Sequence, residues 1–219
     1  NTSKVNLINS GVTGLIEVTG NTVIDSLFMN LEKALTPNYY GINWSLNKII
    51  FVSVHRRENW GNNLEDIIIG LNLILKEFKD IKIILPMHPN PIVRNPLLRS
   101  FKNNKNVSLT EPLNYLDLIG TIKNCNLLLT DSGGLQEEAP ALGKPVLVLR
   151  KTTERPEAIK AGTAKLIGTN PSSIFDEISY LLNDKKAYEK MSKAVNPFGD
   201  GKASKRILNF CLEFLNSSS

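Results

Sequence analysis

Both histidines of the chain stand in polar runs that directly follow stretches rich in aliphatic residues. His55 opens the run HRREN, and His88 lies in the run MHPNP. A histidine titrates near neutral pH, so His55 can exchange a proton with a ligand or donate a hydrogen bond to a phosphate. Arg56 and Arg57 carry the planar fork of N–H groups that binds anions. These two runs therefore predict a site for an anionic ligand.

A third polar run, TDSGG, follows the apolar stretch LLL and contains Ser132, Gly133 and Gly134. The two glycines allow a ligand to approach the backbone closely. The helix expected after them points unpaired N–H groups and its positive dipole end outward, which favours phosphate or pyrophosphate. An ordinary helix that begins with a capping serine after a tight turn fits the same residues, so both interpretations stay open.

Two adjacent acids, Glu137 and Glu138, lie inside this predicted helix. Glu138 is six residues beyond Ser132, too far along the helix to cap its start. A carboxylate directed sideways from there can accept hydrogen bonds from the two hydroxyls of a ribose. An anion site beside a ribose acceptor indicates a nucleotide. We expect the other acid of the pair to face solvent.

Strand and helix candidates alternate along the chain. Strands are expected at Lys48–Val54, Lys82–Leu85, Asn106–Leu109, Asn126–Leu129, Pro145–Leu149 and Lys165–Gly168. Helices are expected at Asn63–Phe78, Pro91–Phe101, Tyr115–Lys123, Leu135–Leu142, Pro171–Leu182, Lys186–Lys193 and Ala203–Leu215. This alternation predicts an α/β fold with a Rossmann-like, doubly wound parallel sheet. Ligands of such sheets bind beyond the carboxyl ends of the strands, where all three polar runs lie.

Composition narrows the class of protein. The 219 residues carry a formal net charge of +5 that is spread along the chain, without the basic stripe of a nucleic-acid-binding protein. The two cysteines are far apart and form no CxxC pair, which indicates a reduced compartment and the cytoplasm. No apolar run approaches the length of a membrane span. The chain opens on Asn rather than Met, so we expect it to be a fragment.

Six motifs in order resemble the non-hydrolysing UDP-N-acetylglucosamine 2-epimerases. They are VTGNTVID, HRREN, HPNP, TDSGGLQEEAPALGKPVLVLR, TERPEA and GDGKAS, which run from Val18 to Ser204. The resemblance implies a GT-B architecture, in which two Rossmann-like domains face each other across a cleft. Residues 46–195 would form the second, UDP-binding domain. Residues 1–45 would connect it to a missing first domain, and the helix in 196–219 would pack towards that domain.

The resemblance also implies a reaction that interconverts UDP-GlcNAc and UDP-ManNAc. UDP is eliminated as the C2 proton is lost, and it adds back after reprotonation on the other face, without NAD, another cofactor or a metal. The family's catalytic carboxylates lie in the first domain, so this chain alone is expected to be inactive. UDP and UDP-GlcNAc are the implied ligands, and a homodimer is implied for the full-length protein.

Site roles follow from the resemblance, motif by motif. Ser132, Gly133 and Gly134 correspond to diphosphate binders, Glu138 to the ribose acceptor, Arg155 to a residue near the diphosphate and His55 to the catalytic histidine. Leu118 stands where many members place an aromatic residue against the uracil, which weakens the expected stacking. Arg56 and His88 match positions implicated in binding a second UDP-GlcNAc as an activator.

Two other functions remain open from the residues. A UDP-sugar glycosyltransferase of the GT-B class shares the second domain and a glutamate on the ribose. HRREN together with TERPEA favours the epimerase. A UDP-binding module without enzymatic activity is the third possibility.

Overall fold

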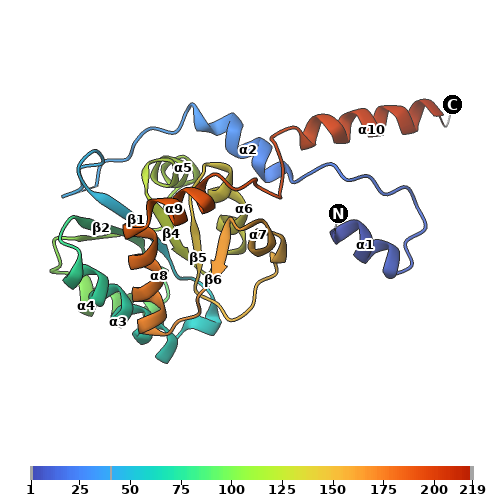
Figure 1. The fold of residues 1–219 in the computed structure, drawn as a ribbon. Coiled ribbons are helices and arrows are strands. Elements are labelled where there is room, and N and C mark those ends of the chain that lie inside the picture. The colour runs from blue at the N-terminus through green and yellow to red at the C-terminus, as the bar shows by residue number, and fades with distance from the viewer. Residues whose placement is uncertain (1, 40, 218–219) are drawn as a thin grey trace.

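The computed structural model describes residues 2–39 and 41–217, and its centre is one six-stranded parallel sheet (Figure 1). The strands are β1 (Lys48–Ser53), β2 (Ile81–Pro86), β3 (Val107–Thr110), β4 (Leu127–Thr130), β5 (Val146–Val148) and β6 (Ala164–Leu166). Their order is β3-β2-β1-β4-β5-β6 and every pair is parallel. This order defines the doubly wound Rossmann-like fold, so the predicted fold class is confirmed.

Helices cover both faces of the sheet. Residues of α3 (Asn62–Glu77), α4 (Pro91–Phe101) and α8 (Pro171–Asn183) share one buried apolar cluster with one face of the strands. Residues of α5 (Tyr115–Asn124), α6 (Gly133–Ala141) and α7 (Pro156–Ala161) share the cluster on the opposite face. Because the strands are buried on both sides, they are nearly continuous runs of Ile, Val and Leu.

The expected elements match the observed ones to within about two residues at each end. The difference that matters is at α6, which begins at Gly133 and not at the expected Leu135. Both glycines therefore lie in the first turn of the helix. The α9 helix (Lys185–Ser192), a short 3-10 turn η1 (Arg57–Asn59) and α7, which begins at Pro156, complete the sheet region.

Residues before the first strand form two helices that the sequence analysis did not predict, α1 (Thr2–Asn9) and α2 (Thr22–Leu31). Asn21 caps α2 by accepting a hydrogen bond from the Val23 N–H. Leu27 of α2 packs in a small buried cluster with Ala34, which follows α2, and with Ile119, which belongs to α5. The connection after α2 then passes so close to α5 that a side chain at Gly120 would lie 2.1 Å from the Leu35 carbonyl oxygen. Here α5 needs a glycine.

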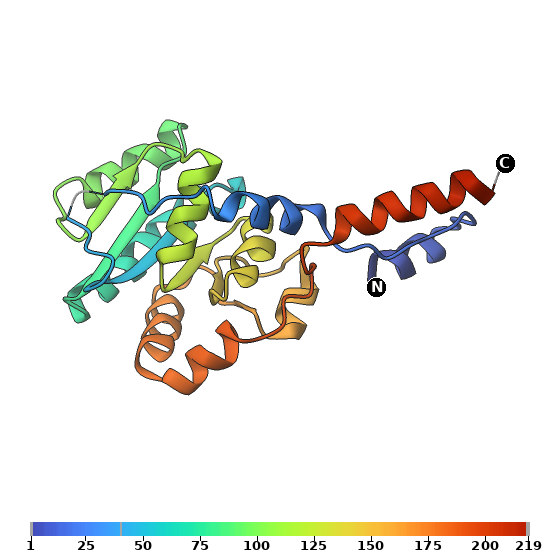
Figure 2. The same ribbon diagram turned by 90° about the horizontal axis from the view of Figure 1, so that it is seen from above.

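Both ends of the described chain extend away from the sheet on the same side. The last helix, α10 (Ala203–Ser217), and the segment that carries α1 project outward in both views (Figures 1 and 2). Several apolar side chains of α10 are exposed, among them Leu208, Leu212 and Phe214. The last two residues of the expected 196–219 segment lie outside the described residues.

A buried carboxylate joins α2 to α10. Asp25 accepts hydrogen bonds from the backbone N–H groups of Ala203 (3.1 Å) and Ser204 (2.8 Å), at the positive end of α10. Burial alone would raise the pKa of Asp25, but these hydrogen bonds outweigh it and lower the pKa below its usual value. The described helices include none with the length and apolar character needed to span a bilayer.

Candidate functional site

The strand order brings the predicted site residues together. β1 and β4 are neighbours at the point where the order of the strands reverses, which is where such sheets bind ligands. His55 follows β1 and Ser132 follows β4, and both line a cavity of about 250 Å³. The same cavity is lined by further predicted residues, namely Gly134, Glu138 and Leu118. The expectation that these runs meet at one edge of the sheet is confirmed.

Asp131, which is completely buried, holds the two central turns against each other. Its carboxylate accepts hydrogen bonds from the backbone N–H of His55 (3.0 Å), the backbone N–H of Arg56 (2.9 Å) and the Asn59 side-chain amide (2.9 Å). The Asn59 amide also donates to the Leu149 carbonyl oxygen after β5 (3.0 Å). Sequence reasoning missed Asp131, although an acid between a strand and Ser-Gly-Gly was a usable signal.

Two arginines flank the first turn of α6. A side chain at Gly133 would lie 3.6 Å from Nη2 of Arg56 and 3.9 Å from Nη2 of Arg155. Ser132 is the N-cap residue but makes no side-chain capping hydrogen bond, so the capping-serine interpretation is not supported. The start of α6 thus combines helix N–H groups, a hydroxyl and two guanidinium groups, which together suit an anion.

The two histidines are neighbours. The ring centroids of His55 and His88 are 5.6 Å apart with an angle of 62° between the ring planes, and the Trp60 ring lies 5.9 Å from the His88 ring. Nδ1 of His88 accepts a hydrogen bond from the Asn90 N–H, which fixes that ring. Burial lowers the pKa of His55 below its ordinary value; the charge of Asp131 opposes this shift and that of His88 adds to it. This shift favours the neutral imidazole form of His55.

Glu138 points into the cavity and has a hydrogen-bond partner that the sequence analysis did not name. The Tyr115 hydroxyl donates to Oε1 of Glu138 at 2.8 Å. Burial, together with the hydrogen bond and charge of Glu138, raises the pKa of Tyr115 to about 12, so the phenol stays protonated as a donor. Burial also raises the pKa of Glu138, the Tyr115 hydrogen bond opposes this shift, and the neighbouring Glu137 charge adds to it.

The expectation that one acid of the pair faces solvent is wrong. Glu137 and Glu138 are each only 6% exposed. Glu137 lies on a different face of α6 from the cavity, where it forms an ion pair with Nε of Arg155 and accepts a hydrogen bond from the Asn21 amide (2.7 Å). A buried carboxylate needs such partners, and here they come from segments that are distant in sequence.

Apolar residues form the other wall of the cavity. Leu118, which is half-buried, lines it together with Phe51, Pro112 and Leu113. At Leu118 the wall offers a base an aliphatic contact in place of aromatic stacking.

Arg150 lies near the site, but two carboxylates already neutralise its charge, so it is less available to an anionic ligand than Arg56 or Arg155. Arg150 is buried and forms ion pairs with both Glu58 and Glu154. The hydrogen bond from Arg150, with a smaller contribution from the charge of Arg56, holds the pKa of Glu154 at about 2. Arg56 itself is 3.8 Å from Glu154, a looser contact that leaves its fork accessible. Within the described residues, no group of three or more His, Cys, Asp or Glu side chains could hold a metal ion.

The lowered pKa of His55 predicts its titration. We expect an NMR titration to give a midpoint for His55 below 6.5, with assignment by a His88→Gln variant that leaves a single histidine signal. The unfolded chain binds this proton more readily than the folded chain. The free energy of unfolding should therefore fall as the pH drops from 6.5 through the lowered pKa. A midpoint at or above 6.5 would contradict a pKa lowered by the partial burial of His55.

Comparison with known proteins matches this chain to a family over nearly its whole length. The family model described as UDP-N-acetylglucosamine 2-epimerase matches residues 1–212. The UDP-N-acetylglucosamine 2-epimerase of Escherichia coli (strain K12) is 46% identical over 217 residues, which cover 94% of this chain and 57% of that protein. The chain thus spans a little more than half the length of the curated relatives it matches.

Solved structures agree in fold. The crystal structure of UDP-GlcNAc 2-epimerase from Neisseria meningitidis bound to UDP-GlcNAc has a TM-score of 0.91 at 40% identity, covering 96% of this chain and 59% of that one. The S. aureus MnaA-UDP co-structure also has a TM-score of 0.91, at 39% identity, covering 97% of this chain and 58% of that one. The fold is that of the second domain of a GT-B architecture, and the chain belongs to the UDP-N-acetylglucosamine 2-epimerase family.

Proposed function

We propose that this chain binds UDP, with the diphosphate at the start of α6 and the ribose on Glu138. The backbone N–H groups of Gly133 and Gly134, the Ser132 hydroxyl and the Arg155 guanidinium would hold the diphosphate. The Glu138 carboxylate would accept hydrogen bonds from the ribose hydroxyls. The uracil would lie against Leu118.

One observation carries this proposal: a buried carboxylate and the anion-binding start of a helix border one cavity at the switch point of the sheet. Ser132, Gly134 and Glu138 border it within a single helical segment, which fits a ligand whose phosphate and ribose are covalently joined. The cavity of about 250 Å³ is slightly smaller than the roughly 300–1,000 Å³ of common ligand pockets, so it suits part of a nucleotide sugar. The sugar would lie outside it.

We propose further that the whole protein interconverts UDP-GlcNAc and UDP-ManNAc. Loss of the C2 proton and departure of UDP from C1 would give bound 2-acetamidoglucal, and protonation on the other face with return of UDP would give the epimer. Neutral His55 lies beside the proposed diphosphate site, where it can donate a hydrogen bond to the leaving UDP or move a proton. The carboxylates that act on the sugar would come from the part of the relatives that this chain does not span.

The family match favours the epimerase over a glycosyltransferase or a binding module. We also propose a second UDP-GlcNAc as an activator beside Arg56 and His88, a homodimer for the whole protein, and action in the cytoplasm. Free thiols at Cys125 and Cys211 support a reduced compartment.

Replacing Glu138 tests the ribose role. Losing a charged hydrogen-bond acceptor typically costs about 1.5–3 kcal/mol. Glu138→Ala should therefore weaken UDP binding in calorimetry by roughly tenfold to a hundredfold. The control is Glu77→Ala, which removes an exposed glutamate at the end of α3 and should leave the affinity unchanged. Equal UDP affinities for the parent and Glu138→Ala would rule out the ribose role.

Turnover separates binding from catalysis. We expect the 219-residue chain to produce no detectable UDP-ManNAc from UDP-GlcNAc. In the proposed site it binds the leaving group, UDP, but presents no acid–base pair to the sugar. Product analysis by NMR measures this directly, with UDP binding by the same sample as the control for folding. Formation of UDP-ManNAc by this chain would show that the carboxylates acting on C2 lie within it.

A further inference from the structure

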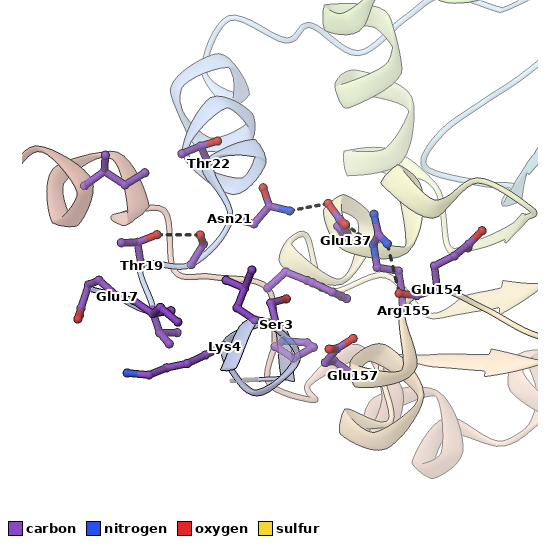
Figure 3. Close-up of a pocket in the computed structure, with 17 residues that line it drawn as sticks. Ser3, Lys4, Glu17, Thr19, Asn21, Thr22, Glu137, Glu154, Arg155 and Glu157 are labelled. Atoms are coloured by element: carbon purple, nitrogen blue, oxygen red, sulfur yellow. Dashed lines mark hydrogen bonds and ion pairs between the residues drawn. The ribbon is translucent and has the colours of Figure 1, made fainter. Parts of the chain in front are cut away.

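Glu137 is a buried carboxylate that the proposed binding of UDP does not use. Figure 3 shows it between the Asn21 side chain, from the start of α2, and the Arg155 side chain, from the turn before α7. One carboxylate oxygen accepts from Nδ2 of Asn21 at 2.7 Å, and the other forms the ion pair with Nε of Arg155. Each oxygen thus has its own donor.

The backbone of Glu137 has a partner from the other end of the chain. Its carbonyl oxygen accepts a hydrogen bond from the Asn196 side-chain amide at 3.2 Å. Two residues later, the Phe198 carbonyl oxygen accepts a hydrogen bond from the Asn21 N–H at 2.8 Å. The segment that leads to α1 and the segment that leads to α10 therefore meet at Glu137, and both of these helices extend away from the sheet (Figure 2).

The ion pair between Glu137 and Arg155 also reaches the start of α6, because the Arg155 guanidinium lies beside Gly133. The ion pair uses Nε of Arg155, while Nη2 of the same guanidinium is the atom that would lie 3.9 Å from a side chain at Gly133. A guanidinium is planar, so fixing Nε fixes the direction of the remaining N–H groups. Glu137 thereby aims Arg155 at the position where an anion would bind.

We propose that Glu137 is a positioning residue that couples the two outgoing segments to nucleotide binding through Arg155. When Asn21 holds one carboxylate oxygen, the other oxygen is fixed for Arg155, and the guanidinium is pre-oriented for the diphosphate. The coupling is reciprocal, so binding of a nucleoside diphosphate at α6 also strengthens the contact at the start of α2. This inference rests on the proposed UDP site and adds a path from it to the segments outside the sheet.

Asn21→Ser tests the coupling with little damage to α2. Serine is as good a helix cap as asparagine, so the cap is kept while the amide donor to Glu137 is lost. We expect UDP binding in the full 219-residue chain to weaken by about three- to tenfold, within the usual range for residues along a coupling path. The matched control is Asn170→Ser, the same change at the cap of α8, which should leave UDP affinity unchanged.

The Arg155→Ala background shows whether the effect passes through Arg155. If it does, Asn21→Ser changes UDP affinity by less than about twofold in that background, because the residue it positions is gone. A merely structural role for Asn21 would give the same loss in both backgrounds. That result, or no loss in the parent chain, would overturn the proposal.

Hydrogen exchange measures the same coupling without any nucleotide. Arg155→Ala should speed exchange of the Asn21 and Val23 amides severalfold, because Glu137 is then less well fixed for Asn21. Unchanged exchange at both amides would overturn the coupling even if UDP binds as proposed. Faster exchange in a chain that does not bind UDP would instead reject the proposed function and leave the coupling from Arg155 through Glu137 to Asn21 established.

Discussion

The hydrogen bonds of the buried Asp131 carboxylate are the constraint on which the site depends. A carboxylate removed from water is stable only if its oxygens are matched by donors, and here three donors come from the turn after β1. Those donors fix His55 and Arg56 relative to the start of α6 at Gly133, two residues beyond Asp131. The anion-binding features of two separate turns become one surface because the sheet places β1 beside β4.

Some charged side chains around this surface pair with each other within the protein, and others are left to contact a ligand. Arg150 is committed to Glu58 and Glu154, whereas Arg56 and Arg155 keep N–H groups directed at Gly133. Adjacent glutamates divide in the same way, with Glu138 facing the cavity and Glu137 facing the segments outside the sheet. Burial and a tyrosine donor hold the first carboxylate in place, and an arginine and an asparagine hold the second.

The sheet and the edge that carries the site could be predicted from sequence, because periodicity and the order of strands and helices are local signals. Buried partners could not be predicted in the same way. Glu137 resembles an exposed helical glutamate in sequence, and its burial depends on Asn21, which is 116 residues away. The donors to Asp131 and the Tyr115 contact to Glu138 likewise arise only when distant segments fold together. Helices α1 and α2 were missed because a connecting segment was expected there.

The central claim is that the start of α6 and Glu138 form one nucleotide site, and affinities for a graded ligand series test it most directly. Calorimetric titration of the unmodified chain with UDP, UMP and uridine separates the diphosphate contribution from the nucleoside contribution. The account predicts that UDP binds tightest, UMP more weakly and uridine weakest, and that added salt weakens UDP most. Equal affinities across the series, or no binding of UDP, would contradict the account.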